Sequence, residues 1–269
     1  MSGDSVVTLQ RMRKLKSWVT PKKTEVSTNK KVTVLTCDPA KTDEAVAEVA
    51  AIVPDHYVSH VHLARVLKRL GKRAAADLVR EKMPTSKSIR SGDLGEILGA
   101  AYVGEFTRYG TGVNRLRWKD HREMAMRGDD IVAVRVTSDG DPRFLKGEAK
   151  SNVTLSKTTV GNARKALKSH NGRPSGHALS FLATRLHEEG KHDLGDVIDD
   201  AQRKNGIQLS EVSHMLFTFS GNDPTKLLTD DLKEYRGRFR QSSVGLKADK
   251  HQEFIKAVFD KVIEDGDDD

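Results

Sequence analysis

The sequence has a single cysteine, Cys37, among its 269 residues. One cysteine excludes an internal disulfide framework and a zinc cluster built on thiolates, so we expect Cys37 to be a small buried side chain. No apolar run approaches the roughly 18 residues that a membrane helix needs. The basic N-terminus is not followed by the apolar segment of a secretory signal. These absences predict a protein of the reducing cytoplasm that does not enter the membrane.

Aromatic residues make up only 5% of the chain and are scattered, so platforms for stacking bases are not expected. No glycine-rich phosphate-binding loop is present either, so any ATP-driven step must come from another protein. Charged residues are plentiful at 31%, and the hydrophobic share is 36%. That balance suits a polar protein with enough length to bury a sizeable core.

Positive charge is concentrated at one end of the chain. Residues 1–90 contain 18 Lys/Arg against 9 Asp/Glu, a balance of +9, whereas the remainder contains 28 against 29, a balance of −1. A basic end suits a polyanionic partner such as nucleic acid. A solvated basic face that aids solubility would look the same in the sequence, so charge alone leaves both readings open.

A polar stretch from Met83 to Gly92 is the best candidate for a domain boundary. It separates a basic, mostly helical N-terminal region, residues 1–85, from a second domain, residues 86–269, with C-terminal helices and an acidic tail. The clearest periodic segments are helical over 61–80, 94–102 and 251–264 and strand-like over 30–36 and 213–220. This mixture predicts an α/β fold with a mixed central sheet flanked by helices.

The most informative segment joins two predicted strands through a tight turn. The first strand opens with the acidic pair Asp129-Asp130, and the second ends in Glu148-Ala-Lys150. Residues 138–142, between them, have the composition of a hairpin turn. Residues two apart on a strand point the same way, so Glu148 and Lys150 are predicted to share a face.

The register of this hairpin decides which aspartate joins them. A turn centred on Gly140 pairs residues whose numbers sum to 280 and places Asp130 opposite Lys150 and diagonal to Glu148. Asp129 would then point to the other face. A one-residue slip or a bulge would exchange the two aspartates, so the pattern favours Asp130 without excluding Asp129.

Two carboxylates and an ammonium at this separation are the minimum equipment for metal-dependent cleavage of a phosphodiester bond. Asp130 and Glu148 can hold Mg²⁺, or Mn²⁺ in its place, which polarises the phosphate and lowers the pKa of a bound water. Lys150 can orient or deprotonate the attacking water, or neutralise the growing negative charge. The structural alternative is a surface hairpin with an Asp–Lys ion pair that contributes about 0–1 kcal/mol.

Glu96 is a further candidate carboxylate, because it lies on the amphipathic helix that precedes the hairpin. Its structural alternative is a capping box, in which Asp93 is the helix N-cap and Glu96 its N3 partner. Glu96 also lies beside Gly99 and Ala100, on a small apolar face that allows the helix to pack on both sides. Both readings of Glu96 stay open.

A basic helix is predicted after the hairpin, over residues 156–169. Its cations are suited to hold a phosphate backbone, which is the source of non-specific affinity for nucleic acid. A helix exposed to water often carries such a row without a function, so this reading also stays open. The candidate contacts are Lys157, Arg164, Lys165 and Lys168.

A helix with Gly-Glu, then Gly-Asp-Asp before an apolar strand, then Gly-Glu-Ala-Lys resembles the PD-(D/E)xK nuclease superfamily. The segments Leu116-Arg-Trp-Lys-Asp120 and Met124-Ala-Met126 extend the likeness to the HamA family, the nuclease subunits of Hachiman bacterial defence systems. The resemblance covers roughly residues 86–220. Gly-Asp-Asp stands where the superfamily name has Pro-Asp, which leaves open which aspartate binds metal.

The resemblance implies a restriction-endonuclease-like core with Asp130, Glu148 and Lys150 at its catalytic centre and Glu96 in support. It implies Mg²⁺ as the cofactor and DNA as the substrate. It also implies a superfamily 2 helicase subunit as the partner, which senses aberrant or invading DNA and restrains the nuclease until then.

Residues and resemblance together predict a cytoplasmic, Mg²⁺-dependent DNA endonuclease of anti-phage defence, with little sequence preference. One alternative is a non-catalytic nucleic-acid-binding or adaptor subunit of a helicase complex, whose DNA binding weakens with salt but cuts nothing. A second alternative is an RNA-cleaving enzyme with the same metal chemistry.

Overall fold

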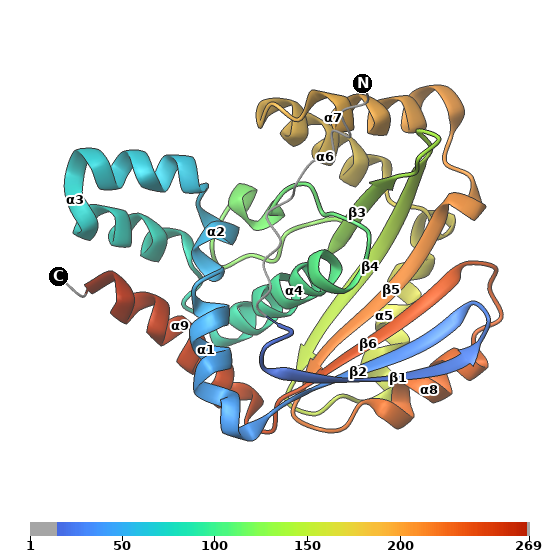
Figure 1. Ribbon diagram of the computed structural model, residues 1–269, viewed down its shortest axis with the longest axis horizontal. Coiled ribbons are helices and arrows are strands. Elements are labelled where there is room, and N and C mark those ends of the chain that lie inside the picture. The colour runs from blue at the N-terminus through green and yellow to red at the C-terminus, as the bar shows by residue number, and fades with distance from the viewer. Residues whose placement is uncertain (1–14, 268–269) are drawn as a thin grey trace.

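A six-stranded mixed sheet covered by helices on both faces forms the computed structural model, which describes residues 15–267 (Figure 1). The strands are β1 (Val19–Ser27), β2 (Lys30–Cys37), β3 (Ile131–Val136), β4 (Pro142–Asn152), β5 (Val212–Ser220) and β6 (Arg240–Lys247). The helices are α1 (Thr42–Ala50), α2 (Val53–Tyr57), α3 (His60–Lys82), α4 (Lys87–Phe106), α5 (Lys157–Lys168), α6 (Gly176–Glu188), α7 (His192–Asp200), α8 (Thr225–Glu234) and α9 (His251–Asp267). The predicted mixed α/β architecture is confirmed.

The strand order is β1-β2-β6-β5-β4-β3. The strands β2, β6, β5 and β4 run parallel to their neighbours in the centre, and β1 and β3 are antiparallel edge strands. The predicted division at residue 85 is not a break in the sheet, because β2 from the first region pairs with β6 from the second. The N-terminal region therefore contributes two strands as well as helices.

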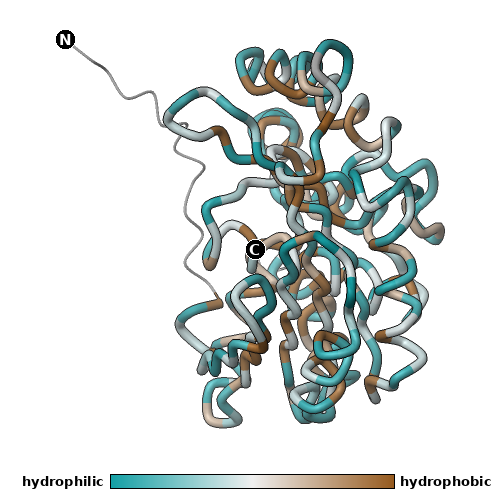
Figure 2. The backbone as a smooth tube through the Cα atoms, turned by 90° about the vertical axis from the view of Figure 1, so that its right-hand side faces the viewer, coloured by the Kyte–Doolittle hydropathy of each residue, from teal (hydrophilic) through white to brown (hydrophobic). Residues whose placement is uncertain are grey.

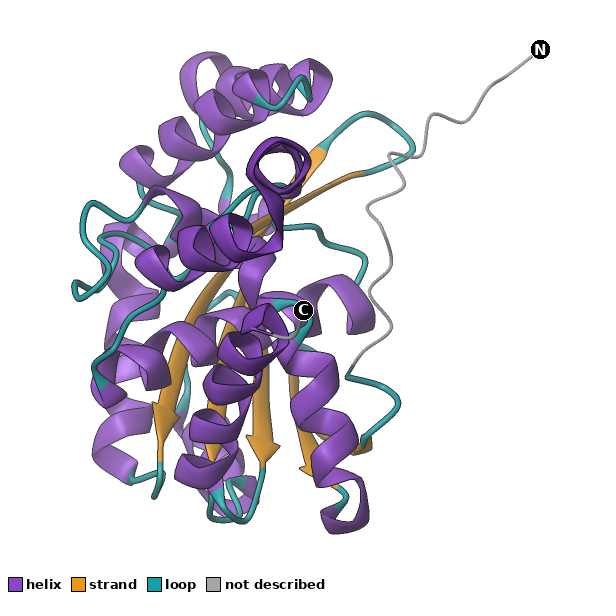
Figure 3. Ribbon diagram, turned by 90° about the vertical axis from the view of Figure 1, so that its left-hand side faces the viewer, coloured by secondary structure: helices purple, strands orange, loops and turns teal. Residues whose placement is uncertain are grey.

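Helices cover both faces of the sheet because its central strands are apolar on both sides. The residues of β5 are almost all buried. One core contains residues of α1, α4 and α9, and another contains residues of α5 and α8. Helices lie on both sides of the strands (Figure 3). Hydrophobic residues accordingly concentrate on the inner segments of the chain (Figure 2).

The helix α4 begins earlier than the sequence predicts. Its N-cap is Ser86, and Asp93 lies buried inside the helix, so the proposed capping box of Asp93 and Glu96 is wrong. The carboxylate of Glu123 accepts hydrogen bonds from the backbone N–H groups of Thr85 and Ser86 at 2.6 and 3.1 Å. This contact joins the start of α4 to the segment that precedes the hairpin.

Other parts of the chain follow the sequence more closely. The predicted basic helix is α5, and Cys37 is buried, with burial first among the causes that raise its pKa to about 11. The acidic tail was predicted to follow the last helix, but α9 continues to Asp267, and residues 268–269 lie outside the described part. No described helix has the length and apolar character to cross a bilayer.

Candidate active site

Asp130, Glu148 and Lys150 lie together at the start of β3, and we call these three residues the hairpin cluster. The pairing of β3 with β4 ends at Gly147, so beyond it β4 has no partner strand on that side in the described part of the chain. The Lys150 Nζ lies 2.5 Å from Glu148 Oε1 and 4.0 Å from Asp130 Oδ2. Asp130 Oδ2 also accepts a 3.0 Å hydrogen bond from the Ala149 N–H, which fixes this carboxylate against the edge of β4.

The predicted hairpin register is wrong, although its consequence for Glu148 and Lys150 survives. The paired residues sum to 278, because the turn is centred on Asp139, where the Thr137 N–H bonds to the Asp141 carbonyl. Asp130 and Lys150 are therefore not cross-strand neighbours. Glu148 and Lys150 still point the same way, because residues two apart on one strand share a face in any register.

Asp129 lies outside the hairpin cluster. Its Oδ1 is 3.1 Å from the Nζ of Lys146, and its Oδ2 accepts a 2.7 Å hydrogen bond from the Ser175 N–H just before α6. The side chains of Lys146 and Asp129 are 1% and 6% exposed, so this is a buried ion pair. Both aspartates precede β3, where strand alternation does not apply, and the structure places Asp130 rather than Asp129 in the cluster.

Burial shifts the titration of the hairpin cluster. Burial and then the charge of Asp130 raise the pKa of Glu148 from 4.5 to about 7, against the opposing effect of Lys150. Burial lowers the pKa of Lys150, but the hydrogen bond to Glu148 and the nearby negative charges outweigh it, so the pKa of Lys150 is raised. Lys150 is therefore an ammonium at neutral pH, suited to orient an anion or a water rather than to remove a proton. Glu148 can exchange a proton near neutrality.

Glu96 reaches the same region from α4. Its Oε2 lies 3.7 Å from the Arg115 Nε and, among the described residues, has no hydrogen-bond donor. Burial is the largest cause that raises the pKa of Glu96 from 4.5 to about 8, with Arg115 opposing it and Asp130 adding to it. The structure thus brings Glu96 into electrostatic contact with the hairpin cluster through Asp130.

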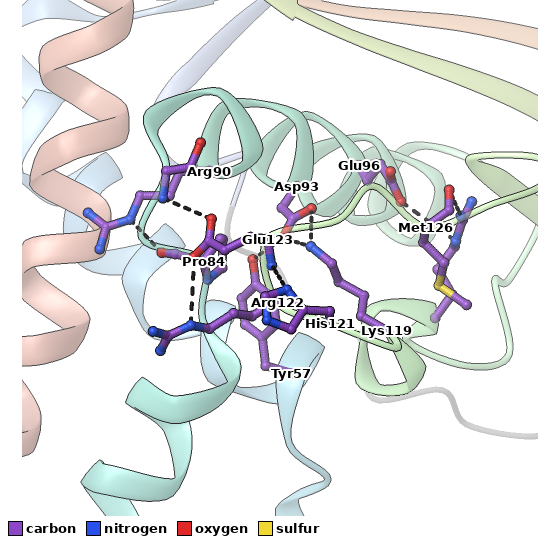
Figure 4. Close-up of polar contacts among 12 residues, drawn as sticks. Tyr57, Pro84, Arg90, Asp93, Glu96, Lys119, His121, Arg122, Glu123 and Met126 are labelled. Carbon is purple, nitrogen blue, oxygen red and sulfur yellow. Dashed lines mark hydrogen bonds and ion pairs between the residues drawn. The ribbon is translucent and has the colours of Figure 1, made fainter.

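Lys119 was not singled out by the sequence, yet it holds α4 in place. Its Nζ lies 2.8 and 3.0 Å from the two carboxylate oxygens of Asp93, and the Tyr57 hydroxyl donates a 2.7 Å hydrogen bond to the same group (Figure 4). The side chains of Lys119 and Asp93 are each 4% exposed. Lys119 lies in irregular chain within the Arg-Trp-Lys-Asp segment, so no periodicity pointed to its partner.

Arg115 is the second cation that sequence reasoning missed. It lies in the short 3-10 helix η2 (Arg115–Trp118) and donates hydrogen bonds to the backbone carbonyls of Met126 and Asp129, immediately before Asp130. Because it also pairs with Glu96, Arg115 ties the segment that carries Asp130 to α4. Its nearness to Leu116-Arg-Trp-Lys-Asp120 was the one available signal.

The hairpin cluster offers oxygen ligands that suit Mg²⁺, but they do not surround a cation position. Within the described residues, no group of three or more His, Cys, Asp or Glu side chains is arranged to hold a metal ion. The Lys150 ammonium lies 2.5 Å from Glu148 and 4.0 Å from Asp130 and supplies positive charge to both carboxylates. Mg²⁺ keeps several waters and needs only one or two carboxylates, so Asp130 and Glu148 fit the ion by the chemistry of their oxygens.

The predicted phosphate contact by Arg164 is wrong. Arg164 faces the interior, where it donates to both oxygens of Asp231 and to Gln241 and lies 5.2 Å from the centre of the Tyr235 ring. Its side chain is 8% exposed. The other three candidates, Lys157, Lys165 and Lys168, are exposed on α5, and their contact with nucleic acid stays a prediction.

Replacing Arg164 by alanine is expected to lower the free energy of unfolding by about 3–5 kcal/mol, because it leaves Asp231 as an unpaired, mostly buried charge. Lys165→Ala should leave stability within about 0.5 kcal/mol, because Lys165 is exposed on the same helix. Urea unfolding of both variants measures the difference. Equal stabilities would contradict the burial of the Arg164–Asp231 pair.

Glu96→Gln is expected to stabilise the isolated protein increasingly as the pH rises. The folded-state pKa of about 8 exceeds 4.5, so the folded protein holds a proton that the unfolded chain releases, and wild-type stability falls as the pH rises through this window. Glutamine removes that loss of stability. The free energy of unfolding of Glu96→Gln should therefore exceed that of wild type by about 2–4 kcal/mol at pH 9 and nearly equal it at pH 5. The measurement is urea unfolding with EDTA at both pH values. Glu234→Gln, at an exposed position, is the control. If the free energies of unfolding of wild type and Glu96→Gln changed equally with pH, the burial of the Glu96 carboxyl group would be contradicted.

Comparison with known proteins assigns the chain to a family. A family model described as HamA matches residues 13–262. A curated relative, the Hachiman protein HamA of Bacillus cereus, is 28% identical over 248 residues, which cover 90% of this chain and 88% of the relative. The match spans the hairpin cluster, Glu96, and both strands of the N-terminal region.

Proposed function

The chain belongs to the HamA family, and on that premise we propose that it is a metal-dependent DNA endonuclease that acts as an effector of bacterial anti-phage defence. The observation that carries the proposal is the hairpin cluster, in which Asp130, Glu148 and Lys150 converge at one end of a sheet. Few structural demands place two carboxylates and an ammonium together at a partly open strand edge.

Each residue of the cluster has a role that follows from its surroundings. Asp130 and Glu148 would hold Mg²⁺, which when bound polarises the phosphate and supplies a reactive water. Lys150, an ammonium with 31% of its side chain exposed, is placed to bind a phosphate oxygen and neutralise the charge that grows during cleavage. Mg²⁺ held there would favour the carboxylate form of Glu148, because a nearby positive charge stabilises that form.

The surrounding fold supports a PD-(D/E)xK core. The helix α4 carries Glu96, the antiparallel pair β3–β4 carries the hairpin cluster, and β5, α8 and β6 complete a mixed sheet. We further propose a helicase as the partner subunit. The chain contains no phosphate-binding loop of its own, so a second protein would supply any ATP-driven step.

Removal of divalent metal is expected to abolish cleavage without unfolding the protein. Plasmid DNA should remain intact with EDTA, should be degraded with Mg²⁺ or Mn²⁺, and should respond to the helicase partner if that subunit restrains the nuclease. Gel analysis of plasmid DNA measures this, and thermal unfolding in EDTA is the control. Undiminished cleavage in EDTA would contradict a metal-dependent mechanism.

A non-catalytic binding subunit is the second candidate function. The observation that favours it is that Lys150 already neutralises Glu148, so the carboxylates are satisfied without a metal. This function predicts DNA binding that weakens steeply with salt and no cleavage with Mg²⁺. A matched pair of DNA and RNA substrates separates DNA cleavage from the remaining alternative, RNA cleavage.

A further inference from the structure

A cavity of about 70 Å³ lies beside the hairpin cluster, between α4, α6 and the start of β3. Glu96 and Asp130 form part of its wall, so the cavity and the hairpin cluster share the Asp130 carboxylate. Its volume has room for several water molecules. A molecule that reacts at the cluster therefore has an adjoining space into which one of its groups can enter.

The wall of this cavity is mainly apolar. The apolar side chains come from η2 and the segment before it, from β3 and from α6. They include Val113, Leu116, Ile131, Val132, Phe181 and Leu182. Water in such a space makes few hydrogen bonds, so a flat apolar surface that displaces it is favoured.

The polar groups of the cavity are divided between interior and rim. Inside, Glu96 Oε2 is buried and has no hydrogen-bond donor among the described residues, and burial lowers the pKa of His56 to about 3, which keeps it neutral. At the rim, the side chains of Arg127 and His177 are exposed. Inside, Arg115 lies 3.7 Å from Glu96 and is the cation beside its carboxylate, and at the rim the charge of Arg127 attracts an anion.

We propose that this cavity receives one unpaired nucleobase of the strand being cut, while the strand's phosphates lie at the rim and at the hairpin cluster. The ligand this chemistry describes has a flat apolar face, a polar edge for Glu96 and an anionic tether, which is a nucleotide within a strand. The inference rests on the proposed nuclease function and deepens it by naming the substrate. A base in a duplex must first be unstacked and unpaired at a cost of a few kcal/mol, so single-stranded or locally unpaired DNA is the preferred substrate.

Filling the cavity gives a direct test. Ala178 lies on α6 in the cavity wall, and Ala178→Trp places a large ring where the base would enter. Thr184 is exposed on the same helix, so Thr184→Trp is the matched control. Both variants should first show wild-type thermal unfolding.

The substrates are labelled single strands in which one abasic position is moved along the sequence. Ala178→Trp should cut ordinary strands about 10-fold more slowly than wild type, because it excludes a base contact. An abasic position at one fixed distance from the cut should restore its cleavage, since the introduced indole then fills the space that the missing base would have occupied. Wild type and Thr184→Trp should cut ordinary strands equally and lose cleavage at that same abasic distance.

Two results would overturn the base pocket while leaving the nuclease intact. One is an Ala178→Trp protein that cuts like Thr184→Trp, and the other is a folded Ala178→Trp protein that no abasic substrate rescues. If wild type cuts nothing with Mg²⁺, the proposed function fails. Binding of a base in the cavity can still be measured without cleavage, from the fluorescence of 2-aminopurine placed in the strand. A rise in 2-aminopurine fluorescence with wild type that is absent with Ala178→Trp supports the base pocket. No rise in fluorescence with wild type overturns it.

Discussion

Lys150→Ala is expected to slow Mg²⁺-dependent DNA cleavage by about 10³-fold or more while the protein remains folded. Lys150 is the cation that contacts both carboxylates of the hairpin cluster, at 2.5 Å from Glu148 and 4.0 Å from Asp130. Its removal takes away the positive charge that would face the phosphate. It also leaves Glu148, whose pKa is already raised to about 7, without the partner that favours its charged form.

Two further variants separate charge from position in this experiment. Lys150→Arg keeps the charge but places a wider, planar group beside the carboxylates, so we expect it to recover little activity. Lys165→Ala removes an exposed lysine of α5 and should retain cleavage within a few-fold at low salt. Plasmid and oligonucleotide cleavage rates measure all three. Activity of Lys150→Ala within tenfold of wild type would remove Lys150 from the mechanism.

The mixed sheet could be predicted because its signals are local. Strand-like alternation over 30–36, the apolar run 213–220 and the hairpin composition at 138–142 each act within a few residues, and β2, β5 and the β3–β4 turn all form there. Such local patterns do not specify the order of the strands in the sheet. The pairing of β2 with β6 joins residues about two hundred positions apart, and nothing in either segment specifies the other.

The site was predictable to the extent that strand geometry governs it. Glu148 and Lys150 share a face in any register, because they are two apart on one strand. Asp129 and Asp130 lie before β3, where the backbone leaves the strand conformation at Gly128, with φ of 98°. Their directions are set by distant partners, Lys146 for one and the Ala149 N–H for the other, and those partners are visible only once the chain has folded.

Burial is the quantity that the sequence conveyed least well. Arg164 looked like one of four cations on a basic helix, yet its position on α5 turns it toward Asp231, a residue of α8. Asp93 looked like a helix cap for a similar reason, since its partner Lys119 lies in irregular chain. A charged residue is predicted to be exposed unless a residue of opposite charge is known to pair with it. The partners of Arg164 and Asp93 lie far from them in the sequence, so sequence reasoning did not find them.

Replacing either of the two adjacent aspartates by asparagine, one at a time, is expected to have opposite consequences for stability and for cleavage. Asp129→Asn should lower the free energy of unfolding by about 3–5 kcal/mol, because it leaves the Lys146 ammonium buried at 1% exposure without a counter-charge. Asp130→Asn should change stability by only about 1 kcal/mol, since the amide oxygen can still accept from the Ala149 N–H. Cleavage should be lost in Asp130→Asn, because a neutral amide is a poor ligand for Mg²⁺ beside Glu148.

Urea unfolding and cleavage rates, measured on the same preparations at a temperature where each variant is folded, separate the two roles. Asp129→Asn should still cut DNA under those conditions, because its carboxylate supports α6 and Lys146 and lies outside the hairpin cluster. The reverse result, with a folded, inactive Asp129→Asn and an active Asp130→Asn, would show that Asp129 and not Asp130 is the metal ligand. For Asp129 to hold the metal, the segment after Gly128 would have to rotate and the buried Lys146 would lose its partner. The cost of that rearrangement is the reason we expect Asp130, and not Asp129, to be the ligand.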